Sequence, residues 1–298
     1  MMSDDQKETL KHGVQQNHDI DPNGTNPKHH ADVLSPQIEN PKNAIEQSAR
    51  ENISRVHINV RKTGRFFACI IIGVIFFGAL ANYSIYNVAP HPEHEIADVL
   101  KRFDLGHEPS IPAFYSSIVM LLAAAAAGFL AIYDTADQSR RRISWIFLSF
   151  ILSLLAIDET VMFHEMGTAA MNKLGMGTSL YFSWVIPGSI FALIAGSMCT
   201  RLLLDLPRRT QLLFVTSAFI FLAGAIGMEL IAGLIFSSSA NELEAVSSTA
   251  HIISQAIEEM MEMAGMALFL CSLLDFINLQ NISIWVQVPS DAMGGRNS

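Results

Sequence analysis

Six apolar stretches, each close to the length of a membrane-crossing helix, constrain the fold of this chain more than any other feature. A helix needs ~20 mainly apolar residues to cross the hydrocarbon core, and it satisfies its backbone hydrogen-bonding groups within the segment. The stretches lie at about 66–88, 114–133, 143–166, 180–200, 211–236 and 252–275. We therefore predict an all-α membrane protein built as a six-transmembrane-helix bundle.

The residues before the first stretch have a different composition. Residues 1–60 are rich in Asn, Gln, Asp, His, Lys and Pro and contain few aromatic residues. Such a segment cannot bury enough apolar surface to offset the entropy of ordering. We expect a disordered polar tail at 1–60, the six-helix domain at 61–278 and a short tail at 279–298. The net charge of −9 argues against a nucleic-acid partner, which needs clustered Lys and Arg.

Basic residues are distributed unevenly among the loops, and this bias predicts how the chain is oriented in the lipid bilayer. Lys and Arg gather before the first helix, between the second and third, and between the fourth and fifth, at Arg55, Arg61, Lys62, Arg65, Arg140, Arg141, Arg142, Arg201, Arg208 and Arg209. The alternate loops hold only Lys101, Arg102 and Lys173. We therefore expect both termini in the cytoplasm.

Acidic side chains interrupt three of the apolar stretches. Each costs at least ~2.5–3.5 kcal/mol at membrane depth, so it usually faces the bundle interior or a wet cavity. They are Asp158, Glu159 and Glu165 in the third stretch, Glu229 in the fifth, and Glu258, Glu259 and Glu262 in the sixth, with His164 and His251 nearby. Seven carboxylates in such positions indicate a functional site.

Depth and helical phase select an inner set among these residues. With a rise of ~1.5 Å per residue, Asp158, Glu229 and Glu258 fall at similar depth in the extracytoplasmic half. At ~100° per residue, a continuous third helix places Asp158 on the same face as Glu165 and turns Glu159 elsewhere. The same rule places Glu258, Glu262 and His251 on one face of the sixth helix.

Mixed carboxylate and imidazole ligands suit iron, manganese or zinc. We therefore predict a divalent transition metal bound by Asp158, Glu165, Glu229, Glu258, Glu262 and His251. Glu259 and His164 are the predicted catalytic residues, because they could move protons beside such a site. The chain lacks the Glu-x-x-His motif of di-iron bundles, so the parallel with those proteins is one of chemistry and not of motif.

Three segments, LAIDETVMFHE, GAIGMELIAG and IEEMMEMAG, resemble those of a group of bacterial multi-pass membrane proteins without an assigned activity. The patterns that carry the resemblance are DExxxxHE, GAxGxE and EExxEM, and they span the third to the sixth helix. The resemblance implies a location in the bacterial inner membrane, and it implies no particular reaction.

Three functions are consistent with these features. The leading hypothesis is a metal-dependent membrane enzyme that acts on a lipid or other apolar substrate, with the metal activating water or oxygen. The first alternative is a proton- or cation-coupled transporter or channel that uses the same acids as binding stations. The second is a non-catalytic membrane sensor or assembly factor.

Overall fold

The computed structural model describes residues 58–88, 94–106, 110–134, 139–173 and 181–280. Every regular element among these residues is a helix, and six spans are long and apolar enough to cross a membrane. The predicted all-α, six-helix membrane fold is therefore confirmed. The predicted polar tails at 1–60 and 279–298 fall almost entirely outside the described residues.

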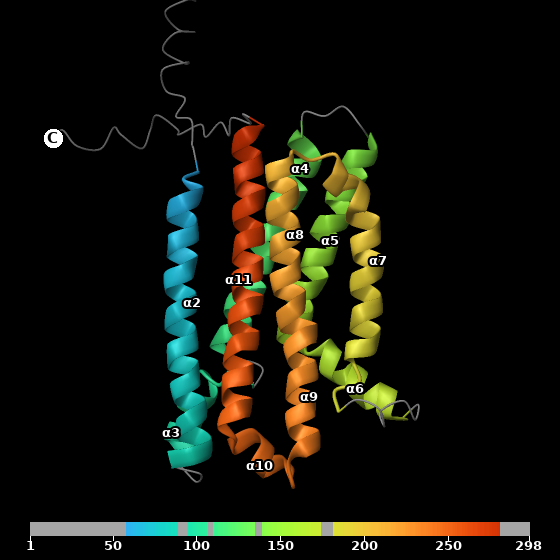
Figure 1. Cartoon of the computed structure of the whole chain (residues 1–298). Coiled ribbons are helices and arrows are strands. Elements are labelled where there is room, and N and C mark those ends of the chain that lie inside the picture. Colours follow the sequence, from blue (N-terminus) through green and yellow to red (C-terminus); the bar gives the residue numbers. More distant parts are fainter. Residues whose placement is uncertain (1–57, 89–93, 107–109, 135–138, 174–180, 281–298) are drawn as a thin grey trace, which may run out of the picture. The chain divides into compact units, whose positions relative to one another are not determined.

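The six spans alternate in direction along the bundle (Figure 1). They are α2 (Val60–Tyr83) extended by the π-helical turn η1 (Ser84–Val88), α4 (Ile111–Tyr133), α5 (Ser139–Val161), α7 (Val185–Leu204), α8 (Arg208–Leu222) continued through the π-helical turn η2 (Ala223–Met228) into α9 (Glu229–Ser238), and α11 (Thr249–Leu279). Three short helices, α3 (His94–Lys101), α6 (Phe163–Lys173) and α10 (Glu242–Ser247), lie at one end of the bundle.

Side-chain caps fix where several helices begin. The Asn59 side chain accepts a hydrogen bond from the Lys62 backbone N–H at 3.1 Å and starts α2. Ser248 does the same for α11, accepting from the His251 N–H at 3.1 Å. These oxygens satisfy backbone donors that have no partner within a helix.

The core lies along α4 and α11, the two most buried of the six spans. Its fully buried side chains include Trp145, Met263 and Phe276. α8 packs closely on α11 at Gly265, where an added Cβ atom would lie 2.7 Å from the backbone nitrogen of Phe221. The absence of a side chain at this position allows the two backbones to approach.

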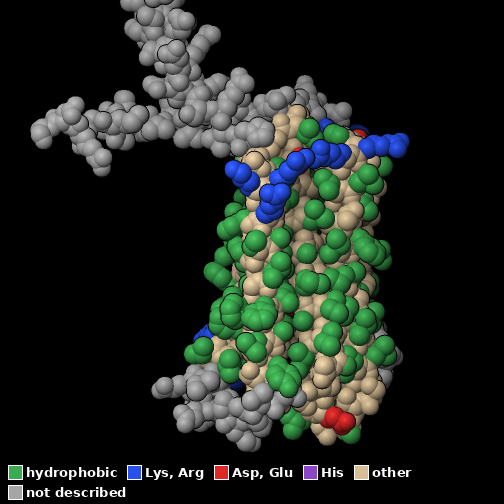
Figure 2. Space-filling model, turned by 60° about the vertical axis from the view of Figure 1, so that its left-hand side comes forward, with side chains coloured by type: hydrophobic (Ala, Val, Ile, Leu, Met, Phe, Trp, Pro, Cys, Tyr) green, Lys and Arg blue, Asp and Glu red, His purple; other side chains and the backbone are tan. Residues whose placement is uncertain are grey.

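Basic side chains are distributed unevenly between the two ends of the bundle. Lys and Arg gather at the end where α2, α5 and α8 begin, which we call the basic end (Figure 2). The other end carries α3, α6 and α10, and we call it the outer end. Because basic loops stay on the cytoplasmic side of most membrane proteins, the basic end is the predicted cytoplasmic one.

The structure corrects the predicted third helix, which was expected to run unbroken over 143–166. α5 ends at Val161, and α6 begins at Phe163. Between them, Met162 has a positive φ of 60°, a left-handed conformation that ends an α-helix. The fourth span likewise begins at Val185, later than the predicted residue 180.

Candidate functional site

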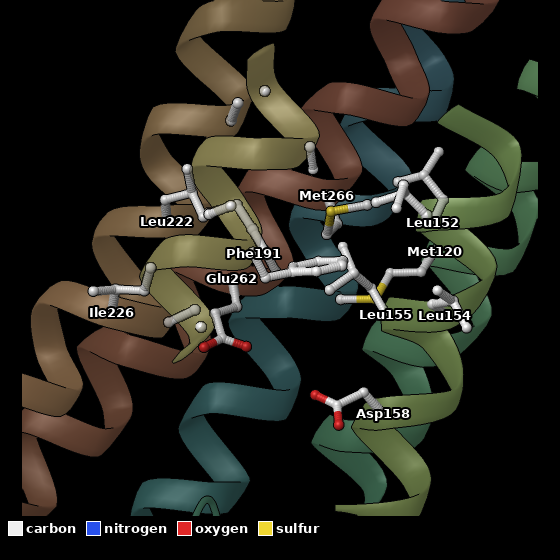
Figure 3. Close-up of a pocket in the computed structure, with 18 of the residues that line it drawn as sticks. Met120, Leu152, Leu154, Leu155, Asp158, Phe191, Leu222, Ile226, Glu262 and Met266 are labelled. Atoms are coloured by element: carbon white, nitrogen blue, oxygen red, sulfur yellow. The ribbon is translucent and has the colours of Figure 1, made fainter. Parts of the chain in front are cut away.

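A cavity of about 710 Å³ lies between α5, α7, α8 and α11, and we call it the chamber. Its part toward the basic end is apolar and is lined by Leu148, Leu202, Leu203, Phe214 and Phe269. In Figure 3 the carboxylates of Asp158 and Glu262 lie on different helices, both below apolar side chains such as Leu152 and Met266. The chamber is therefore amphipathic, with a long apolar part and an acidic end.

The acidic end brings together carboxyl groups from three membrane spans. Its titratable lining residues are Asp158, Glu159, Glu229, Glu258, Glu259, Glu262 and His164, and no Lys or Arg occurs among the described lining residues. Carboxylates crowded together disfavour one another's ionisation. The acidic end must therefore share protons among its carboxyl groups or attract a cation.

Asp158 and His164 form a close pair across the break between α5 and α6. The His164 Nδ1 atom lies 3.1 Å from Asp158 Oδ2, and the His164 backbone N–H donates to Asp158 Oδ1 at 3.0 Å. The left-handed Met162 folds the chain back so that one carboxylate contacts both the backbone and the ring of the same histidine. A carboxylate in this position orients an imidazole for proton transfer.

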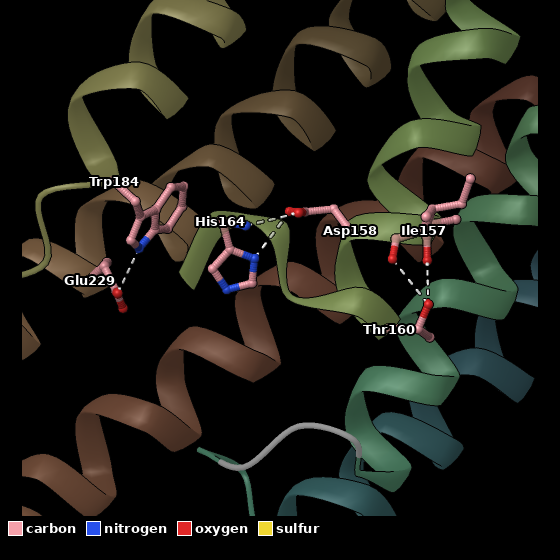
Figure 4. Close-up of polar contacts among 7 residues, drawn as sticks. Ile157, Asp158, Thr160, His164, Trp184 and Glu229 are labelled. Atoms are coloured by element: carbon pink, nitrogen blue, oxygen red, sulfur yellow. Dashed lines mark hydrogen bonds and ion pairs between the residues drawn. The ribbon is translucent and has the colours of Figure 1, made fainter. Parts of the chain in front are cut away.

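A row of side chains continues from this pair to the opposite wall of the chamber (Figure 4). The His164 ring lies against the Trp184 ring, with centroids 5.0 Å apart. The Trp184 Nε1–H donates to Glu229 Oε1 at 2.9 Å. Glu258 lies close to Glu229 and to Glu159. The row therefore connects α5, α6, α7, α9 and α11.

The π-helical turn η2 positions Glu229 and the acids of α11. It comes directly before Glu229, and such turns often occur at functional sites because the extra residue redirects the side chains that follow. Gly224 within it packs closely on α11, where an added Cβ would lie 3.1 Å from the Glu258 carbonyl oxygen and from Glu262 Cγ. The two acidic helices are therefore held in contact at this level.

The wall formed by α7 packs loosely on the rest of the bundle. Only two of its residues, Val185 and Leu202, are buried. Phe191 lines the chamber yet remains 40% exposed, and Gly196 also both lines the chamber and lies on the exposed surface. The chamber is thus separated from the surroundings of the bundle by a single, loosely packed helix.

The structure places most of the predicted site residues in the chamber. Asp158, Glu229, Glu258 and Glu262 line it, as do the predicted catalytic residues Glu259 and His164. The side chain of Glu165 lies outside the described part of the chain.

His251 does not line the chamber, so the structure does not bring it together with the other predicted ligands. It is buried near the start of α11, where its ring packs edge-on against Phe236 with centroids 5.0 Å apart. Although His251 shares a helix face with Glu258, it does not reach the chamber, because it lies two turns further toward the outer end and contacts α9 there.

Two residues of the acidic end were not selected from the sequence. Glu159 was turned away from the site by the phase of an uninterrupted helix, yet it lines the chamber. Trp184 is typical of an aromatic belt at a membrane interface, but its indole N–H binds Glu229. Its position at the same depth as the acids was the signal that could have identified it.

The metal prediction has no direct counterpart in this geometry. Within the ranges the structure describes, no group of three or more His, Cys, Asp or Glu side chains is arranged to hold a metal ion. Asp158 contacts His164, and Glu229 accepts a hydrogen bond from Trp184. Iron, manganese or zinc binding stays a prediction.

A model for a family described as a domain of unknown function, DUF8692, matches residues 66–276. The match includes every residue that lines the chamber. No curated protein and no solved structure matches the chain.

Proposed function

We propose that this chain, which belongs to the DUF8692 family, is a membrane enzyme that acts on the polar end of a lipid-like substrate. The observation that supports this proposal is the chamber, which joins a long apolar part to an acidic end containing an aspartate–histidine pair. Its volume of about 710 Å³ falls within the ~300–1,000 Å³ typical of small-molecule sites.

The apolar part of the chamber would hold the hydrocarbon portion of the substrate. Its lining consists mainly of Leu, Phe and Met side chains, and the Ser217 hydroxyl there already donates to the Phe214 carbonyl oxygen. A polar molecule would therefore lose most of its hydration there without compensation. The loosely packed α7 wall favours entry from the bilayer, because Phe191 and Gly196 belong to both the chamber and the exposed surface.

The acidic end would carry out the chemistry. Asp158 holds the Nδ1 side of the His164 ring, which fixes the ring's orientation and leaves Nε2 as the atom that exchanges a proton with the substrate. Glu229 and Glu258 lie close to one another, and two neighbouring carboxyl groups disfavour each other's ionisation, which favours a proton on one of them. This pair would supply a second proton-transfer group opposite His164, with Glu259 beside it.

A divalent metal remains part of this proposal. The oxygen donors of Glu229, Glu258 and Glu262, together with an imidazole, have the chemistry that manganese or iron accepts. A bound ion would supply Lewis-acid activation of water or oxygen. It would also neutralise the carboxylates of the acidic end.

The transport alternative has less support. A pathway for protons or cations requires polar stations on both sides of the acids. Between Glu262 and the basic end, the described lining residues are mainly apolar, including Leu202, Leu203 and Phe214. This arrangement favours a site that opens toward one side.

Filling the chamber tests the proposal. Gly196 lines the chamber, and an added Cβ atom would have no neighbour within 4 Å, so Gly196→Phe should fill the space without straining the fold. Gly73 in α2 is equally open but does not line the chamber, so Gly73→Phe is the matched control. We expect lipid that co-purifies with the parent and the control, measured by mass spectrometry, to be lost from Gly196→Phe.

Catalysis is tested separately from binding. Cells that express the parent protein should consume a lipid species that persists in cells expressing His164→Gln, while the purified variant still retains bound lipid. Binding without any change in the lipid profile would favour the sensor alternative. Equal lipid content in the parent and Gly196→Phe would contradict the proposal.

A further inference from the structure

A second, smaller cavity of about 60 Å³ lies beside the acidic end, and we call it the port. It is formed by the segment before α7 and one face of α9, with Tyr181, Phe182, Glu229, Gly233 and Ser237 among its lining residues. Glu229 also lines the chamber, and it is the one described residue that the two linings share.

The port runs along one face of α9, where a row of Glu229, Gly233 and Ser237 lies beside Leu230 and Leu234. Glu229, Gly233 and Ser237 are spaced four residues apart, which places them on one face of a helix. This row runs from the acidic end at Glu229 toward the exposed Ser237 near the outer end. Tyr181 on the other wall is 39% exposed. The port therefore connects Glu229 with the outer surface of the protein.

The opposite wall of the port is held in place by aromatic packing. The Tyr181 ring stacks on Phe236 with centroids 4.7 Å apart, and Phe182 packs edge-on against the same ring. The Tyr181 hydroxyl donates to Glu242 Oε1 at 3.1 Å. Burial and this carboxylate raise the pKa of Tyr181, so the hydroxyl remains a donor at neutral pH. The cavity is therefore preformed.

Size and polarity suit the port to water. One water molecule needs at least ~10–15 Å³ of such space and two to four polar partners, so a cavity of about 60 Å³ accommodates more than one. The Glu229 carboxylate and the Ser237 hydroxyl supply polar atoms along it. Gly233 keeps it open, because an added Cβ would already be in van der Waals contact, 3.6 Å from both Phe182 Cδ2 and Tyr181 Cβ.

We propose that the port is an aqueous entrance through which water and protons reach Glu229 from the outer end, separate from the route by which an apolar molecule enters the chamber. This entrance supplies water and exchanges protons at the acidic end while the apolar part stays dry. Its use by a reaction rests on the proposed function, whereas the existence of the entrance does not.

Silver ion, a small thiol-reactive cation, tests the port. Cys69, Cys199 and Cys271 are the three cysteines of the chain, and all are replaced by Ala before Glu229→Cys is introduced. Silver is added to the outer side of intact cells, and the remaining thiol is measured with a fluorescent maleimide after denaturation. We expect rapid loss of the thiol at position 229.

Variants of Gly233 test whether silver reaches position 229 through the port. We expect Gly233→Leu to slow the silver reaction by about tenfold or more, equivalent to ~1.4 kcal/mol of added barrier. Gly233→Ala, whose methyl group fits at contact distance, should fold normally and give an intermediate rate. Gly227→Leu is the matched control, because its Cβ would have no neighbour within 4 Å and it does not line the port.

A chain whose single cysteine is Cys199, which lines the apolar part of the chamber, should react slowly with silver because a cation is excluded from apolar surroundings. An unreactive thiol at position 229, or equal rates in the parent and both Gly233 variants, would overturn the proposal. Because these rates do not depend on lipid binding, failure of the port and failure of the proposed function are distinguishable.

Discussion

The Nδ1 atom of His164 lies 3.1 Å from the Asp158 carboxylate, although a helix break at Met162 separates the two residues. The break itself makes the contact possible. In a continuous α-helix, residues six apart are separated by ~600° of rotation and therefore point in directions ~120° apart. The left-handed conformation of Met162 changes the direction of the chain and brings the His164 imidazole close to the Asp158 carboxylate.

The conformation of Met162 gives the first prediction. A left-handed backbone costs a residue with a side chain ~1–2 kcal/mol, whereas glycine adopts it readily. We expect Met162→Gly to stabilise the protein by up to ~1 kcal/mol and Met162→Ile to destabilise it by at least ~1 kcal/mol. Unfolding in a denaturing detergent, followed by circular dichroism, measures both changes. Lower stability of the glycine variant would contradict the prediction.

The close contact between α8 and α11 gives the second prediction. At Gly265 an added Cβ would lie 2.7 Å from Phe221 N and 2.9 Å from its Cα, and backbone atoms cannot move aside as a side chain can. We expect Gly265→Ala to cost ~1–3 kcal/mol. Gly73→Ala, in open surroundings, should instead gain ~0.5–1 kcal/mol from helix propensity. The same unfolding assay compares the two, and equal stabilities would show that the helices separate without cost.

The third prediction concerns the metal. If the acids of the chamber share an ion, its loss should accompany removal of any single ligand. We expect stoichiometric metal in the gently purified parent, measured by elemental mass spectrometry, and a steep fall in Glu229→Gln, Glu258→Gln and Glu262→Gln. Asp205→Asn, at the exposed end of α7, is the control. A metal-free parent would reject this part of the proposal and leave the protonated-acid arrangement in place.

The fourth prediction fixes orientation. Ser139 and Ser238 are both exposed and lie at the basic and outer ends respectively. In a chain without other cysteines, Ser238→Cys should react with a membrane-impermeant thiol label in intact cells. Ser139→Cys should react only after lysis. The reverse pattern would invert the predicted topology and would move the port to the cytoplasmic side.

The lateral arrangement of the acids was only partly predictable. Depth, calculated from the rise per residue, placed acids of three helices at one level, and Asp158, Glu229, Glu258 and Glu262 line one cavity. Helical phase did not predict the position of side chains where the helix was not regular. It excluded Glu159, which lines the chamber, and it included His251, which packs against Phe236 instead.

The number of membrane spans and the clustering of Lys and Arg at one end of the bundle could be predicted from the residues alone. Both are local properties, because a span must be apolar over its own length and must satisfy its own backbone hydrogen bonds. The way in which Asp158, His164, Trp184 and Glu229 meet depends on the folded arrangement of the helices. One left-handed residue and one π-helical turn each rotate the following side chains away from the regular helical phase. Packing between helices, which hydropathy does not encode, determines where such irregularities are stable.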